Sequence, residues 1–286
     1  IEQIIFQMLP SIDSINVWGG EDNDPPIYGK VLLSIKPTNA LYLSDIERER
    51  IQYTLRHNHS VLGISPILLN PTYIKLNVNV LVKYNSQITM LSIHEISDMV
   101  RNNIIYYSNT TLNSFGDHFR YSKFLNLIDN THSSIKNNIT KLSVIITKEI
   151  HESELTYIFK FSNKIKKGTI KSSPIKLVGD DRSYTISDNI NGELIAFTYD
   201  DNGIRYINPF VNGTINYISG EVILRNVTLQ RVVDYSDISV ECVLQSFDVY
   251  TKENQVLYID VDELDIEVIE DSLYVDDMSR HTVKIL

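Results

Sequence analysis

Apolar and polar residues alternate through most of the segment from Tyr73 to Tyr84, with Leu81 as the exception. A period of two residues is typical of a β-strand with one buried face. One face of the predicted strand carries only aliphatic side chains, which are those of Ile74, Leu76, Val78, Val80 and Val82. Lysine and asparagine residues dominate the other face, so the segment predicts a half-buried strand.

The pattern changes to a helical period between Ser92 and Tyr107. Apolar residues recur there every three or four positions, at Ile93, Ile96, Val100, Ile104 and Tyr107. Ser92 and Glu95 have the spacing of a capping box, which predicts where this helix begins. A shorter helix at 121–129 and an apolar strand at 142–146 follow. This order of strand, helix, helix and strand predicts a compact α/β unit at residues 71–150.

Residues 1–70 are expected to form an N-terminal entry region that precedes the α/β unit. Its expected elements are a helix, a strand and a second helix at residues 1–9, 31–37 and 44–57. Ser44 and Glu47 form another capping box at the start of the second helix. The predicted inner stripe of that helix includes Ile46, Ile51 and Leu55. Turn-rich passages containing glycine and proline separate these elements.

Beyond Leu155 the helical period disappears and short apolar runs take over. The expected strands lie at residues 175–178, 194–199, 204–207, 214–218 and 221–229. Turn-forming pairs that separate them include Asn191-Gly192, Asn202-Gly203, Asn212-Gly213 and Ser219-Gly220, which predicts a series of hairpins. Near the end, the apolar parity flips around Asp262-Glu263, so a turn or bulge is expected there. The fold class is therefore α+β, with a β-rich acidic domain at residues 151–286.

The α/β unit, preceded by the turn-rich segment from Val17 to Pro26, resembles the Baseplate J family of phage tail proteins. Within that family it is most similar to the baseplate wedge proteins of T-even contractile-tailed phages, of which the chain would be a C-terminal fragment. The resemblance implies a non-enzymatic structural subunit of the virion's tail baseplate, assembled in the host cytoplasm. It further implies a subunit that forms a dimer and a higher ring around the tail hub, binds other wedge proteins and relays baseplate rearrangement to sheath contraction.

Charge is distributed unevenly along the chain. The net charge is −10 over 286 residues. Residues 1–150 carry 13 basic and 13 acidic side chains, whereas residues 151–286 carry 13 and 23. Binding to nucleic acid requires a basic surface, so no nucleic-acid partner is expected. Apolar runs are far shorter than the roughly 20 residues that a membrane helix needs, so no membrane partner is expected either. The first residue is Ile1, which suggests a fragment or a processed form.

Candidate chemical groups are sparse. Cys242 is the single cysteine, which excludes an intrachain disulfide and predicts a buried strand residue. His57 and His59 lack a third ligand nearby, so no metal site is predicted. An acidic series, Asp260, Asp262, Glu263, Asp265 and Glu267, lacks the glycine and ligand spacing of a calcium loop. A solvated acidic face is expected there, and a basic partner surface stays open as an alternative.

No nucleophile elbow, phosphate loop or zinc-protease motif occurs, so no catalytic residue and no cofactor is predicted. The alternative is a tail-associated hydrolase of host surface polymer, with paired carboxylates in the β-rich domain. A third hypothesis is a carbohydrate-binding or calcium-binding module. Large aromatic side chains favour protein interfaces, and the candidate interface residues are Trp18, Tyr28, Tyr106, Tyr107 and Phe119.

Overall fold

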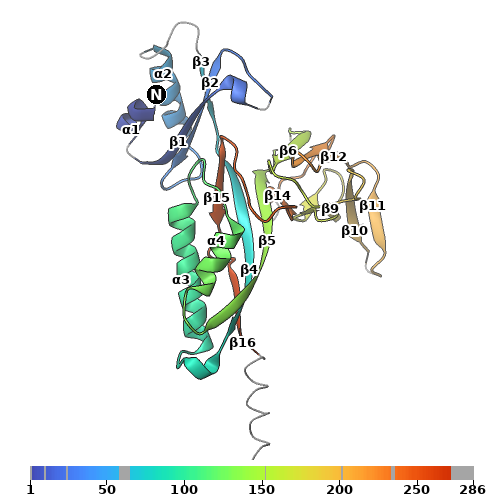
Figure 1. Cartoon of the computed structure of the whole chain (residues 1–286). Helices are drawn as coiled ribbons and strands as arrows, with labels where there is room; N and C mark the ends of the chain where they lie inside the picture. Colours follow the sequence, from blue (N-terminus) through green and yellow to red (C-terminus); the bar gives the residue numbers. More distant parts are fainter. Residues whose placement is uncertain are drawn as a thin grey trace, which may run out of the picture. The chain divides into compact units, whose positions relative to one another are not determined.

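The computed structural model describes residues 2–9, 11–23, 25–57, 65–151, 153–200, 202–232 and 236–271. It confirms a mixed α+β fold (Figure 1). The chain divides into two compact units that are not continuous in sequence. Unit 1 contains residues 1–74, 112–118 and 250–258, and unit 2 contains the remainder. The division of the sequence at residues 70 and 150 stays a prediction.

Unit 1 is built on a three-stranded sheet with two helices. Strand β1 (Ile12–Gly19) pairs antiparallel with β2 (Lys30–Pro37), and β3 (Ser65–Leu69) pairs parallel with β2. Helices α1 (Glu2–Met8) and α2 (Asp45–His57) contribute to one apolar core with the sheet. Its buried members are Ile5, Leu9, Ile12, Leu33, Ile35, Ile51, Leu55 and Leu68.

The sequence pattern missed two strands of unit 1. Strand β1 was not predicted because its pairing with β2 is irregular between Ile12 and Ser14, which interrupts a simple alternation. Strand β3 contains Pro66 as its second residue, and proline reads as a strand breaker. Helix α2 was correctly predicted. Its capping box is confirmed, because the Ser44 amide donates to Glu47 Oε2 at 2.9 Å.

Unit 2 contains most of the larger mixed sheet, whose strand order is β11-β10-β9-β7-β14-β5-β4-β15. The central strands are β4 (Thr72–Tyr84), β5 (Ile135–Glu149) and β14 (Asp237–Cys242). At its edge, β16 (Asp265–Glu270) runs parallel to β4. The alternation predicted for β4 is confirmed, because all five of its aliphatic residues on one face are buried.

Two helices of unit 2 follow β4 in the chain. Helix α3 (Ile93–Thr111) packs against β16, and α4 (Tyr121–Asp129) packs against β5 (Figure 1). The predicted inner stripe of α3 is confirmed from Ile96 onward, whereas Ile93 is exposed at the first turn. The Ser92 amide donates to Glu95 Oε2 at 2.7 Å, which confirms the capping box.

The β-rich region after residue 150 contains hairpins. Strands β9 (Ser183–Asp188), β10 (Leu194–Tyr199) and β11 (Arg205–Asn208) form an antiparallel series, and β7 (Lys171–Ser172) and β8 (Ile175–Lys176) pair with β9. A separate sheet has the order β12-β13-β6, from Asn212–Asn216, Glu221–Arg225 and Thr156–Lys160. Gly192, Gly203 and Gly220 have φ angles of 96°, 76° and 73°, which confirms the turns predicted there.

One predicted turn is wrong. Asn212 and Gly213 belong to strand β12. A Cβ atom on Gly213 would lie 2.6 Å from the carbonyl oxygen of Ile223 and 2.4 Å from Leu194 Cδ1, so glycine allows a close approach of strands there. The expected break near Asp262 is confirmed, because β15 (Gln255–Ile259) ends before it and β16 begins after it.

Candidate protein interfaces

The five aromatic residues predicted at interfaces separate into two groups. Tyr28 and Tyr106 are strongly exposed, whereas Trp18, Tyr107 and Phe119 are buried within their own units. An exposed aromatic side chain retains its area for a partner, so an interface role for Tyr28 and Tyr106 stays a prediction. Packing within the chain accounts for the three buried residues.

Three buried aromatic residues of unit 2 form a cluster, defined here by Tyr107, Phe119 and Phe124. The ring centroids of Tyr107 and Phe119 are 6.3 Å apart, and those of Phe119 and Phe124 are 5.2 Å apart. The Tyr107 and Phe124 rings meet edge-on at 5.5 Å. These separations lie in the favourable range for aromatic pairs, so the cluster stabilises the packing of α3, α4 and the segment between them.

Helix α2 exposes an apolar side chain that the sequence pattern placed inside. Ile46 is 80% exposed, whereas Ile51 and Leu55 are buried. Five residues of helix turn through about 140° beyond one full rotation, so Ile46 points away from the direction of Ile51. The predicted inner position of Ile46 is therefore wrong. Ile46 and Tyr53, which is 63% exposed, lie seven residues apart on the outer face of α2.

Strand β11 and its flanks form a second exposed apolar surface, in unit 2. Its exposed side chains are those of Tyr199, Ile204, Tyr206, Ile207 and Phe210. The guanidinium carbon of Arg182 lies 4.3 Å from the Tyr206 ring centroid, and that of Arg205 lies 3.9 Å from the Phe197 centroid. The sequence predicted this strand but not the surface. The sequence feature that could have indicated this surface is the presence of apolar residues on both faces of one short strand, at Tyr206 and Ile207.

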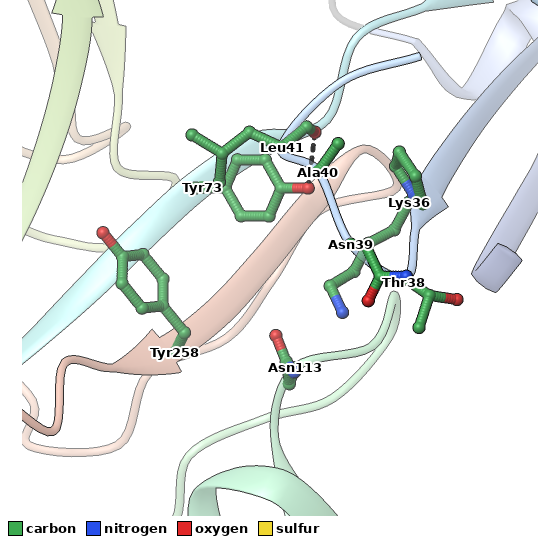
Figure 2. Close-up of a pocket in the computed structure, with 9 residues that line it drawn as sticks. Lys36, Thr38, Asn39, Ala40, Leu41, Tyr73, Asn113 and Tyr258 are labelled. Carbon is green, nitrogen blue, oxygen red and sulfur yellow. Dashed lines mark hydrogen bonds between the residues drawn. The ribbon is translucent and has the colours of Figure 1, made fainter. Parts of the chain in front are cut away.

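Unit 1 contains a hollow of about 470 Å³ (Figure 2). Tyr73 lines it and donates from its hydroxyl to the Leu41 carbonyl oxygen at 2.7 Å. The rings of Tyr73 and Tyr258 meet edge-on with their centroids 6.3 Å apart. The other polar residues of the lining are Lys36, Thr38, Asn39 and Asn113. Burial raises the pKa of Tyr73, so its hydroxyl stays protonated near neutral pH.

The chemistry of this hollow does not fit a glycoside hydrolase. A retaining or inverting glycosidase needs two carboxyl groups facing the substrate, and no aspartate or glutamate lines the hollow. The ammonium group of Lys36 is paired with Asp13, with Nζ and Oδ2 2.7 Å apart.

The Asp13 and Lys36 pair gives a prediction about stability and pH. Replacing Asp13 with asparagine leaves the buried Lys36 ammonium without its counterion, which should lower the free energy of unfolding at pH 7 by about 1–2 kcal/mol. This value is below that of a fully buried pair because Asp13 is partly exposed. Urea unfolding of the parent and Asp13→Asn proteins measures the difference.

The pH dependence follows from the hydrogen bond that Lys36 donates. That bond lowers the pKa of Asp13 below 3.8, so the pair stabilises the fold at neutral pH and the effect is lost as the pH falls through the lowered pKa. The parent and Asp13→Asn proteins should therefore converge in strongly acidic solution. Lys36→Met is the control, and it should cost less than Asp13→Asn at pH 7. An equal or larger loss in Lys36→Met would contradict the account.

The cysteine and the acidic residues considered as chemical sites lie in ordinary structural environments. Cys242 is fully buried in β14, and burial raises the pKa of its thiol. Asp265 and Glu267 are exposed on β16 as predicted, and Glu263 Oε2 lies 2.6 Å from Lys75 Nζ. Within the described ranges no group of three or more histidine, cysteine or acidic residues is arranged to hold a metal ion. None of the helices described for this chain is long and apolar enough to cross a membrane.

Comparison with known proteins shows which family this chain resembles. Residues 2–69 match the family model described as baseplate structural protein gp6, C-terminal domain I, and residues 70–147 match the model of C-terminal domain III. The baseplate wedge protein gp6 of Enterobacteria phage T4 is 24% identical over 196 residues, which cover 65% of this chain and 29% of that protein. The predicted resemblance to a wedge protein is thereby confirmed. The two consecutive matches together span about half of the chain. The members of this family are structural components of the phage tail and not enzymes. The chain therefore belongs to the gp6 family of baseplate structural proteins.

Proposed function

We propose that this chain is part of a baseplate wedge subunit that self-associates into a ring around the tail hub and also contacts other wedge proteins. The chain spans less than a third of the T4 wedge protein, so the role of the whole subunit is inferred from this part. The observation that carries the proposal is apolar surface that the chain's own core does not use. Such surface is typical of a subunit whose partners cover it.

A closed ring makes a specific demand on its subunits. Each subunit must contact two neighbours, through one heterologous interface or through two different isologous interfaces. Exposed apolar side chains occur in both units of this chain, on the outer face of α2 and along β11. Two separate apolar surfaces support a subunit with more than one kind of contact.

The outer face of α2 combines exposed apolar and charged side chains, as protein interfaces commonly do. Glu49 and Arg50 are exposed between Ile46 and Tyr53 on this face. The apolar pair supplies area to bury, and the two charges restrict which partner surface fits. We assign this face to contacts with neighbouring wedge proteins.

Transmission of a baseplate rearrangement requires contacts of unequal strength. A subunit can relay a change of shape if it keeps one interface while it exchanges another, because packed interfaces switch between discrete arrangements. Backbone pairing at a strand edge suits a retained contact, and a small charged helix face suits an exchanged one. This assignment of strong and weak contacts is the mechanism that we propose.

Self-association of the chain is the direct test. Sedimentation velocity over a wide range of concentration should show a reversible dimer or larger oligomer that dissociates on dilution. Addition of salt should weaken contacts that depend on surface charge and leave apolar pairing largely intact. A strict monomer at the highest concentration would contradict the proposal.

A further inference from the structure

Strand β11 ends the larger sheet, and its free edge carries unpaired backbone groups. In the register with β10, Tyr206 is opposite Thr198, and the Asp200 amide donates to the Ile204 carbonyl oxygen at 3.0 Å. Hydrogen-bonded positions alternate along an antiparallel pair, so the backbone of Tyr206 faces β10. The N–H and C=O groups of Arg205 and Ile207 therefore point away from the sheet, where no described residue pairs with them.

This edge lacks the protection that natural edge strands usually have. Such edges are protected by outward charges, proline or bulges. The four residues of β11 contain no proline, and their pairing with β10 has no register shift. The one charged side chain, that of Arg205, lies over the Phe197 ring. The strand is short, and exposed apolar side chains border it on both faces.

We propose that β11 pairs antiparallel with β11 of a second copy of this chain, about a twofold axis at Tyr206. The inference rests on the self-association proposed above and names its contact. In this pairing Arg205 of each copy is opposite Ile207 of the other. Both N–H groups and both C=O groups of each free edge then find partners, because each strand offers the same two residues.

Charge and side-chain packing support a second copy as the occupant. Each Arg205 is opposite an isoleucine of the other copy, so no like charges face each other directly. The two Tyr206 side chains lie side by side on one face, and each Ile207 packs against the aliphatic stem of the other copy's Arg205 on the opposite face. One isologous contact thus covers the Tyr206 and Ile207 side chains of both copies.

Disulfide trapping tests the predicted register. Tyr206 would occupy a non-hydrogen-bonded position opposite itself, where Cα atoms are about 4.5 Å apart, within the range of a disulfide. Tyr206→Cys should therefore form a covalent dimer under mild oxidation, visible in non-reducing electrophoresis. The native Cys242 does not compete, because its side chain is fully buried.

Ile204→Cys is the matched control. Ile204 is exposed, immediately precedes β11 and lies two residues before Tyr206. In the proposed register the two copies of residue 204 are separated by about 13 Å along the strands, too far for a disulfide. We expect the Tyr206→Cys protein to be cross-linked at least about tenfold more than the Ile204→Cys protein.

Ile207→Pro, made in the Tyr206→Cys background, tests the role of the backbone. Proline removes an N–H that faces away from β10, so the chain's own sheet keeps its hydrogen bonds. Circular dichroism should be unchanged, while the covalent dimer should be lost. A folded Ile207→Pro variant that still cross-links fully would overturn the proposed pairing.

The outcomes separate this inference from the broader proposal. If the parent protein self-associates but Tyr206→Cys is cross-linked no more than Ile204→Cys, the β11 pairing is wrong and self-association stands. If the parent protein is a monomer at every concentration, both are wrong. Strong, selective cross-linking at residue 206 that Ile207→Pro abolishes supports both.

Discussion

Replacing Tyr107 with alanine is expected to lower the free energy of unfolding by about 3–5 kcal/mol. Tyr107 is 8% exposed and packs against Phe119 and Phe124, so truncation leaves a cavity between α3 and α4. The loss combines the transfer free energy of the ring with the cost of that cavity. Urea unfolding monitored by circular dichroism measures it.

The neighbouring Tyr106 provides the control. It has the same chemistry and lies on the same helix, but it is 68% exposed. Alanine has a higher helix propensity than tyrosine, so Tyr106→Ala should change the free energy of unfolding by no more than about 0.5 kcal/mol. Similar losses in the two variants would show that the assignment of Tyr107 to the core is wrong.

This pair of residues illustrates what the sequence could predict. The helix that contains both tyrosines could be predicted, because its apolar period and its capping box are local sequence features. Both side chains were proposed as interface residues, although only one is exposed. Burial depends on the cluster with Phe119 and Phe124, which lie in later segments, and no local pattern reveals that packing.

Replacing Gly220 with alanine is the second large effect. Gly220 has a φ angle of 73°, and a Cβ atom there would lie 2.2 Å from the carbonyl oxygen of Asn163. The Gly220 carbonyl oxygen also accepts a hydrogen bond from the Phe161 amide at 2.8 Å, which holds the two segments together. Strain at positive φ and the backbone clash should together cost about 2–5 kcal/mol.

Gly203 separates these two causes. Its φ angle is 76°, close to that of Gly220, but a Cβ atom there would meet nothing within 4 Å. Gly203→Ala should therefore cost only the conformational strain, about 1–2 kcal/mol. Thermal or urea unfolding of the two variants compares them directly. Equal losses would show that the contact with Asn163 does not constrain the turn.

Long-range pairing limited the prediction of the fold. Strand β4 was identified from its alternation, and the hairpins from their turn residues, because both signals lie within a few residues. Strands β1 and β3 were missed, since a pairing irregularity and Pro66 obscured them. The insertion of β14 between β5 and β7 joins segments far apart in the chain, and no local signal encodes it.

The candidate interfaces were harder to predict than the fold. Ile46 was placed inside α2 because apolar residues were counted on one helix without a partner to fix its phase. The edge position of β11 depends on the order of the whole sheet, so the strand was predicted without its exposed edge. Exposed apolar residues become recognisable as an interface only when the fold shows which core they do not enter.

A cryo-electron microscopy map of the baseplate from the phage that encodes this chain would test the central claim most directly. The account predicts copies of the chain arranged in a closed ring, each in contact with another copy. Copies that are separated from one another by other proteins, or a baseplate that does not contain the chain, would contradict it.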